Sequence, residues 1–140
     1  MRQIGCGVSS AMTAIKKQIA TDSAPQAVGS YSQAVQSGEW LFLSGQIALD
    51  PVSGLLVGES AVEQADRVLK NILAVLQAAG GDFSNLLKVT IFLVDLADFA
   101  GVDSVYSSYL KPPYPARATV GVAALPKGAL IEIEAMARLN

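Results

Sequence analysis

The chain has 140 residues, of which 51% are hydrophobic and only 16% charged, and its formal net charge is −2. This composition is that of one folded domain, and it excludes a disordered protein and a protein that binds nucleic acid through a basic surface. The absence of histidine excludes sites built on imidazole, and the single cysteine excludes internal disulfides and thiolate zinc sites.

The low charge also bears on assembly. A small domain has much surface for its volume, so a chain this apolar either exposes a large apolar area or buries it against copies of itself. We therefore expect a homo-oligomer. The alternative is a monomer whose surface consists of small, weakly polar residues.

The N-terminal segment shows no pattern of a packed element, and Met12 offers a second place at which the chain could start. We expect residues 1–13 to be a tail or to precede an alternative start, and residues 14–140 to form the domain. No stretch is long and apolar enough to cross a membrane. We expect a cytoplasmic protein, with organellar targeting by the acid-free tail as the weaker alternative.

The first half of the chain is typical of short strands joined by tight turns. Residues 15–21 are a short extended candidate, followed by a loop rich in Pro, Gly and Ser. Two further strands, over 33–36 and 39–47, flank Ser37-Gly38 and are predicted to form a hairpin. A turn-rich stretch follows over residues 49–58.

The second half alternates helices and strands. Apolar residues at steps of three and four predict a helix over 59–79, which Gly80-Gly81 ends. The nearly continuous apolar run over 86–94 predicts a strand covered on both faces. A second helix begins at Asp95 or Asp98, and strands follow over 117–123 and 130–137. The order β-β-β-α-β-α-β-β predicts an α+β fold with two helices on one face of the sheet.

Few residues suggest chemistry by themselves. Arg117 stands in an uncharged run and offers a planar fork suited to a carboxylate, but it is equally an ordinary ion-pair residue. Glu132 and Glu134 face the same side of one strand, which a solvated face also explains. Ser44 has no histidine to activate it, so its hydroxyl is more simply bonded to backbone.

An ordered set of short motifs carries more information. They are Gly29-Ser30-Tyr31-Ser32-Gln33-Ala34, Ser44-Gly45-Gln46, Pro115-Ala116-Arg117-Ala118-Thr119-Val120, Val122-Ala123-Ala124-Leu125-Pro126-Lys127-Gly128 and Ile131-Glu132-Ile133-Glu134-Ala135. Together they closely resemble the RidA/YjgF family of reactive-intermediate deaminases, older members of which were named L-PSP endoribonucleases or translation inhibitors. The resemblance runs from about residue 15 to residue 139.

The resemblance implies a fold and an activity. The fold is chorismate-mutase-like, with a curved mixed sheet and two helices packed on one face, assembled as a homotrimer with sites between subunits. The activity is the hydrolysis of 2-imino or enamino acids, such as 2-iminobutanoate and 2-iminopropanoate, to 2-oxo acids and ammonia. No metal or organic cofactor is implied, and neither a nucleic-acid nor a membrane partner is expected.

The resemblance also assigns roles to residues. Arg117 matches the arginine that binds the substrate carboxylate, and Glu132 matches the glutamate proposed to activate the attacking water. Tyr31, Ser44 and Gly45 match pocket residues. Thr119 and Asp103 match two further positions of the substrate pocket. Many relatives have Cys at the position of Thr119, so no thiol is required here. Asn is frequent at the position of Asp103, so this chain brings a negative charge toward the site.

Two other functions remain open at this point. One is an endoribonuclease or translation inhibitor, against which the acidic balance and the missing histidine argue. The other is a non-catalytic protein that binds 2-oxo acids through the same Arg117.

Overall fold

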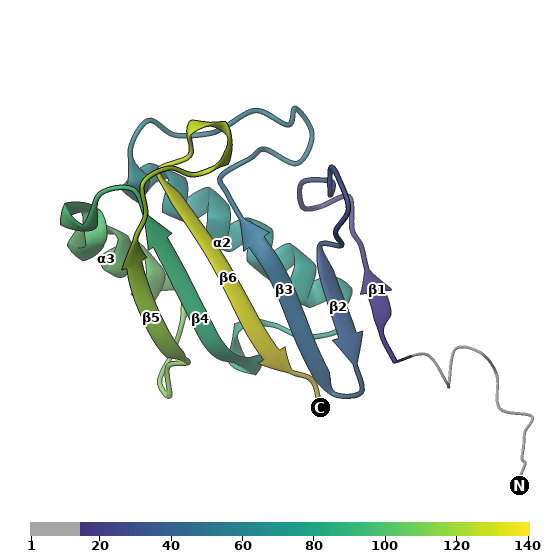
Figure 1. The fold of residues 1–140 in the computed structure, drawn as a ribbon. Coiled ribbons are helices and arrows are strands. Elements are labelled where there is room, and N and C mark those ends of the chain that lie inside the picture. Colours follow the sequence, from purple (N-terminus) through teal and green to yellow (C-terminus); the bar gives the residue numbers. More distant parts are fainter. Residues whose placement is uncertain (1–14) are drawn as a thin grey trace, which may run out of the picture.

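A single six-stranded sheet forms the frame of the computed structural model, which describes residues 15–140 (Figure 1). Residues 1–13, predicted to be a tail or to precede an alternative start, lie outside the described residues. The strands are β1 (Lys17–Ile19), β2 (Ala34–Ser37), β3 (Trp40–Gln46), β4 (Leu86–Leu93), β5 (Ala116–Gly121) and β6 (Ile131–Arg138), in the order β1-β2-β3-β6-β4-β5. Only β4 and β5 pair in parallel. The sheet is therefore mixed, as predicted.

Two helices, α2 (Ala61–Ala78) and α3 (Phe99–Tyr109), lie behind the sheet in the view of Figure 1. The Ser60 hydroxyl accepts a hydrogen bond from the backbone N–H of Glu63 and so caps the start of α2. Asp95 caps a 3₁₀ turn, η2 (Leu96–Asp98), that leads into α3. Further 3₁₀ turns are η1 (Phe83–Asn85) and η3 (Pro126–Gly128). Both helices cover one face, which confirms the predicted architecture.

The core between the sheet and α2 contains two buried polar side chains that the apolar spacing did not predict. The Asn71 amide nitrogen donates to the carbonyl oxygens of Ile47, at 3.3 Å, and Leu49, at 3.0 Å. Gln64 accepts from the N–H of Leu130 and donates to the carbonyl of Gly58. These amides tie the loops at one end of the sheet to the helix.

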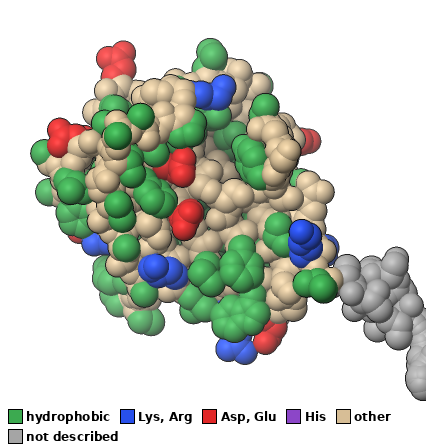
Figure 2. All heavy atoms as spheres, viewed as in Figure 1, with side chains coloured by type: hydrophobic (Ala, Val, Ile, Leu, Met, Phe, Trp, Pro, Cys, Tyr) green, Lys and Arg blue, Asp and Glu red, His purple; other side chains and the backbone are tan. Residues whose placement is uncertain are grey.

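The other face of the sheet is open, and here the expectation for β4 was wrong for a single chain. Its residues alternate between the core and this face, and Leu87 is 45% exposed. Phe42 and Met136 lie opposite each other on β3 and β6, and both are exposed. Figure 2 looks onto this face and shows hydrophobic side chains gathered on it, with acidic side chains in a hollow near its middle. The strand is apolar on both sides, but only one side is covered.

In the described part of the chain, no helix combines the length and the apolar character needed to cross a bilayer.

The Asn71 amide is expected to be a major local contribution to stability. Asn71→Leu removes the donor to two backbone carbonyls: that of Leu49 is left without a partner, while that of Ile47 still accepts from the Leu49 N–H. The free energy of unfolding should fall by about 1–3 kcal/mol, measured by chemical denaturation. Gln77→Leu on the exposed side of the same helix is the control and should change it by less than about 0.5 kcal/mol. Equal denaturation midpoints for the two variants would contradict this role.

Candidate active site

Glu132 lies on the open face of the central strand β6. Its register partner on β4 is Phe92, and the neighbouring Glu134 is opposite Thr90. Glu132 is half-buried, and this burial raises the pKa of its carboxyl group, with a smaller contribution from the negative charge of Glu134. A carboxylate with a raised pKa is a stronger base than an exposed one, so Glu132 is suited to proton transfer.

Gly45 provides the space that this carboxylate occupies. The register between β3 and β6 shifts between Leu43 and Gln46, which places the Gly45 backbone beside Glu132. A Cβ atom built on Gly45 would lie 2.5 Å from Glu132 Oε2 and 2.8 Å from its Cδ. In the structure, the missing side chain of Gly45 admits the Glu132 carboxylate.

Tyr31 contributes to the same pocket from the loop before β2. The buried Gln33 side chain holds this loop by donating to the carbonyls of Thr21, Ala24 and Pro25, while its oxygen accepts from the N–H of Thr21. The pocket measures about 390 Å³, and Tyr31, Gly45, Lys127 and Glu132 are among its lining residues. Three of the predicted site residues are therefore brought together within one chain.

Ser44 does not line this pocket. Its hydroxyl donates to the carbonyl oxygen of Ser32 at 2.6 Å, and its N–H donates to that of Gln33. The hydroxyl proton is thus used to fasten the Tyr31 loop to β3.

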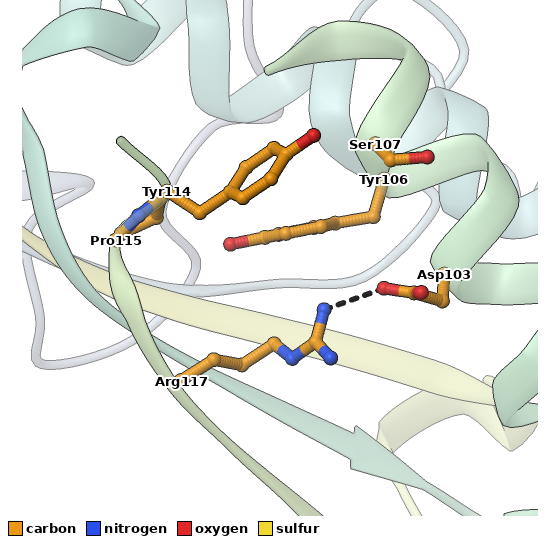
Figure 3. A pocket seen from close by; sticks show the side chains of 6 residues that line it. All are labelled: Asp103, Tyr106, Ser107, Tyr114, Pro115 and Arg117. Atoms are coloured by element: carbon orange, nitrogen blue, oxygen red, sulfur yellow. Dashed lines mark hydrogen bonds and ion pairs between the residues drawn. The ribbon is translucent and has the colours of Figure 1, made fainter. Parts of the chain in front are cut away.

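Arg117 lies on β5, the strand at the sheet edge beside α3. Its Nη1 donates to Asp103 Oδ1 at 2.6 Å, and its Cζ lies 4.9 Å from the ring centre of Phe99 and 5.1 Å from that of Tyr106. Figure 3 shows the guanidinium group beside Asp103 and the Tyr106 ring. These contacts hold the cation in one place through an ion pair and two aromatic faces.

A second pocket, of about 380 Å³, opens beside this cation. Its lining residues are Asp103, Tyr106, Ser107, Tyr114, Pro115 and Arg117. Asp103, predicted to bring a negative charge near the ligand, is in direct contact with Arg117. Thr119, two residues further along β5, is half-buried and lines neither pocket.

The two pockets lie on different sides of the sheet. Arg117 is in register with Val89, which is 1% exposed and faces the helices. Glu132 is in register with Phe92 on the open face. Because residues in register point to the same side of a sheet, Arg117 and Glu132 point to opposite sides. One chain therefore presents two separate halves of the expected site.

Sequence reasoning missed several lining residues. It did not connect Tyr106, a residue of the second helix, with Arg117. The spacing of Phe99, Asp103 and Tyr106 at four and three residues puts them on one side of a helix, and this signal could have found the arginine's surroundings. Within residues 15–140, no three His, Cys, Asp or Glu side chains are arranged to hold a metal ion.

Comparisons with known proteins agree with the family resemblance of the motifs. The family model described as Endoribonuclease L-PSP matches residues 21–139. A mouse protein named 2-iminobutanoate/2-iminopropanoate deaminase is 50% identical over 123 residues, which cover 88% of this chain and 91% of that protein. Its name corresponds to the activity that the resemblance implied.

Solved structures of the same family share this fold. The crystal structure of RidA from an Antarctic Psychrobacter superposes with a TM-score of 0.85 at 46% identity, covering 88% of this chain and 99% of that one. The crystal structure of E. coli TdcF with bound serine has a TM-score of 0.83 at 39% identity, covering 89% and 99%. The family match over most of the chain, the shared fold and the ordered motifs together establish that this chain belongs to the RidA/YjgF family, the family of the Endoribonuclease L-PSP model.

Proposed function

We propose that this protein hydrolyses small 2-imino acids to 2-oxo acids and ammonia, with Glu132 as the general base and Arg117 as the carboxylate-binding residue. The observation that carries the proposal is the half-buried Glu132 carboxylate, with its raised pKa, in a pocket beside Gly45 and Tyr31. Relatives about half identical to this chain are named deaminases of such imines.

The chemistry needs a base more than a nucleophile. As the oxygen of a water molecule forms a bond to the imine carbon, Glu132 takes one of its protons, and the C=N electron pair moves to nitrogen. The resulting carbinolamine collapses when the C–N bond breaks: the O–H electrons form the C=O bond, and the hydroxyl proton passes to solvent. Glu132 returns its proton to the departing nitrogen, which leaves as ammonia. A raised pKa suits both steps, since the same group accepts and then donates.

Arg117 would supply orientation. A guanidinium group can hold a carboxylate through two parallel hydrogen bonds, which fixes the position of the adjacent imine carbon. Asp103 is bonded to Nη1 only, and residues 15–140 provide no hydrogen-bond acceptor for Nε or Nη2. That edge of the fork is therefore available to a ligand.

We further propose that the complete site forms between two chains of a homotrimer. Arg117 and Glu132 point to opposite sides of the sheet in one chain, so a small substrate that contacts both must contact two chains. The exposed apolar residues of the open face offer the surface for such assembly. They include Phe42, Leu87, Val120 and Met136.

The test is imine hydrolysis coupled to an enzyme that releases the imine, followed as 2-oxo acid formed above the spontaneous rate. Arg117→Lys keeps the charge but loses the planar fork, so kcat/KM should fall about 100-fold. Glu132→Gln cannot accept a proton, so kcat should fall about 10²–10⁴-fold while the affinity for a 2-oxo acid stays unchanged.

Glu134→Gln is the matched control on the same strand face. It should retain nearly full activity at neutral pH. Because Glu134 helps to raise the pKa of Glu132, this variant should also shift the acidic limb of kcat/KM to lower pH. Equal losses at the two positions would rule out Glu132 as the sole base. If the wild-type protein binds 2-oxo acids without hydrolysing imines, the result supports the alternative of a non-catalytic binding protein. RNA cleavage without imine hydrolysis supports the endoribonuclease alternative.

Mixed trimers test the shared site. Wild-type protein should form particles of about 44 kDa, three times the 14.6 kDa of one chain. Equal co-expression of Arg117→Lys and Glu132→Gln chains gives mostly mixed trimers, each with one site in which both residues are intact. The mixture should recover roughly a quarter of wild-type activity by random assortment. No recovery would mean that each site lies within one chain.

Gly45→Ala tests the placement of the carboxylate. The new Cβ would displace Glu132 from its position, so kcat should fall about 10–100-fold. The melting temperature should change by less than about 3 °C, because only one half-exposed side chain moves. Gly121→Ala, whose Cβ would meet only the exposed Leu96 side chain at 3.1 Å, is the control. Full activity in Gly45→Ala would disprove the need for this glycine.

A further inference from the structure

The pocket beside Arg117 contains a buried hydroxyl group that nothing satisfies. Tyr106 is 3% exposed, and among the described residues its hydroxyl is the buried side-chain oxygen without a hydrogen-bond partner. In Figure 3 this hydroxyl points away from helix α3, toward the segment of Tyr114 and Pro115 that forms the opposite wall. Burying an unbonded hydroxyl is costly, so it marks a place where a partner is expected.

Of the other polar side chains of the pocket, Tyr114 is 53% exposed to solvent, and the remaining ones already have partners. Ser107 donates its hydroxyl proton to the carbonyl of Ser104 within the helix. Asp103 and Arg117 bind each other through Nη1. Burial raises the pKa of Tyr106, so the hydroxyl keeps its proton and can donate it at neutral pH. Besides the exposed Tyr114, the pocket therefore offers a ligand the free edge of Arg117 and the buried Tyr106 hydroxyl as donors.

We propose that Tyr106 is a specificity-determining residue that hydrogen-bonds the side chain of the substrate, and that this pocket selects 2-imino acids whose side chain ends in an uncharged hydrogen-bonding group. The inference rests on the proposed function, because it takes Arg117 to hold the substrate carboxylate. A ligand anchored there extends its side chain within the same pocket, along the wall to which Tyr106 and Tyr114 contribute.

Asp103 sets the second limit on the ligand. Its carboxylate lines the pocket within 2.6 Å of the Arg117 guanidinium, so an acidic side chain would bring a further negative charge close to it. A purely apolar side chain would instead leave the Tyr106 hydroxyl unbonded. An uncharged hydroxyl group avoids both penalties.

Three 2-oxo acids of similar size, each used freshly dissolved, separate these cases. They are 4-hydroxy-2-oxobutanoate, 2-oxopentanoate, which replaces the hydroxyl with a methyl group, and the dicarboxylate 2-oxobutanedioate. Dissociation constants are measured by calorimetry on the full-length protein. The hydroxylated ligand should bind about 10-fold more tightly than its methyl analogue, the ratio expected for one hydrogen bond.

Tyr106→Phe should abolish this ratio and leave the affinity for 2-oxopentanoate within about 3-fold of wild type. Tyr109→Phe is the control, because its hydroxyl bonds Asp66 on the other helix and does not line this pocket. It should keep the ratio. Asp103→Asn should strengthen binding of the dicarboxylate more than that of the other two ligands.

The outcomes separate this proposal from the proposed function. Equal affinities for the hydroxyl and methyl ligands in the wild type, or a ratio that survives in Tyr106→Phe, would overturn the role of Tyr106, since its hydroxyl would then bond only water. Imine hydrolysis would stand in that case. Failure to bind any 2-oxo acid, together with no imine hydrolysis, would instead overturn the proposed function.

Discussion

The alternation of side chains along strand β6 is the constraint on which the rest of the structure depends. This strand lies at the centre of the sheet, between β3 and β4. Its alternation therefore fixes which side chains of both neighbouring strands face the helices. Ile131 and Ile133 pack against the helices, and Glu132 and Glu134 therefore must face the open side. A slip of one residue would bury both carboxylates in the core, which makes this register strongly specified.

The same alternation gives Glu132 its chemistry. A carboxylate on the outer face of a two-layer protein is ordinarily solvated, and its pKa is then ordinary. Here Phe92 and the Gly45 backbone flank it and remove part of its water, while Glu134 adds a like charge. The strand pattern that stabilises the core thus also places a stronger base in a pocket.

Arg117 depends on a different feature, the parallel pairing of β4 and β5. A parallel pair needs a crossover connection, and here that connection includes helix α3. The helix returns the chain to the sheet edge and brings Phe99, Asp103 and Tyr106 over the arginine. The connection that makes the strand pairing possible also forms one wall of the pocket beside Arg117.

The sequence could predict the features that repeat along the chain. Steps of three and four residues located α2, and the Ile–Glu alternation placed Glu132 and Glu134 on one face. The apolar run of β4 led to the wrong prediction that both faces of this strand are covered. Leu87 and Phe92 are as apolar as core residues, but a single chain leaves their side of the strand uncovered. An apolar run by itself does not say whether the same chain covers both faces of its strand.

Other features of the site could not be found from spacing, because they depend on contacts between distant residues. Gly45 and Glu132 are 87 positions apart, and only the shifted register of β3 against β6 brings the backbone of one under the carboxylate of the other. Gln33 and Asn71 are polar residues that a sequence pattern would place at the surface. In the structure both are buried, and their amide groups donate hydrogen bonds to loop carbonyls. Such anchors are specified by the fold and not by any local period.

The ion pair between Arg117 and Asp103 is the feature that most needs a physical explanation, because a carboxylate beside the arginine proposed to bind the substrate carboxylate would compete with it. Both side chains are partly exposed, at 27% and 43%, so the pair contributes at most about 1 kcal/mol and is inexpensive to rearrange. The substrate and the product differ in charge, so Asp103 affects their binding unequally. A protonated imino acid carries one positive and one negative charge and is neutral overall, whereas the 2-oxo acid product is an anion. Asp103 therefore repels the product more than the substrate, and a residue that weakens anion binding in general can assist product release at this site.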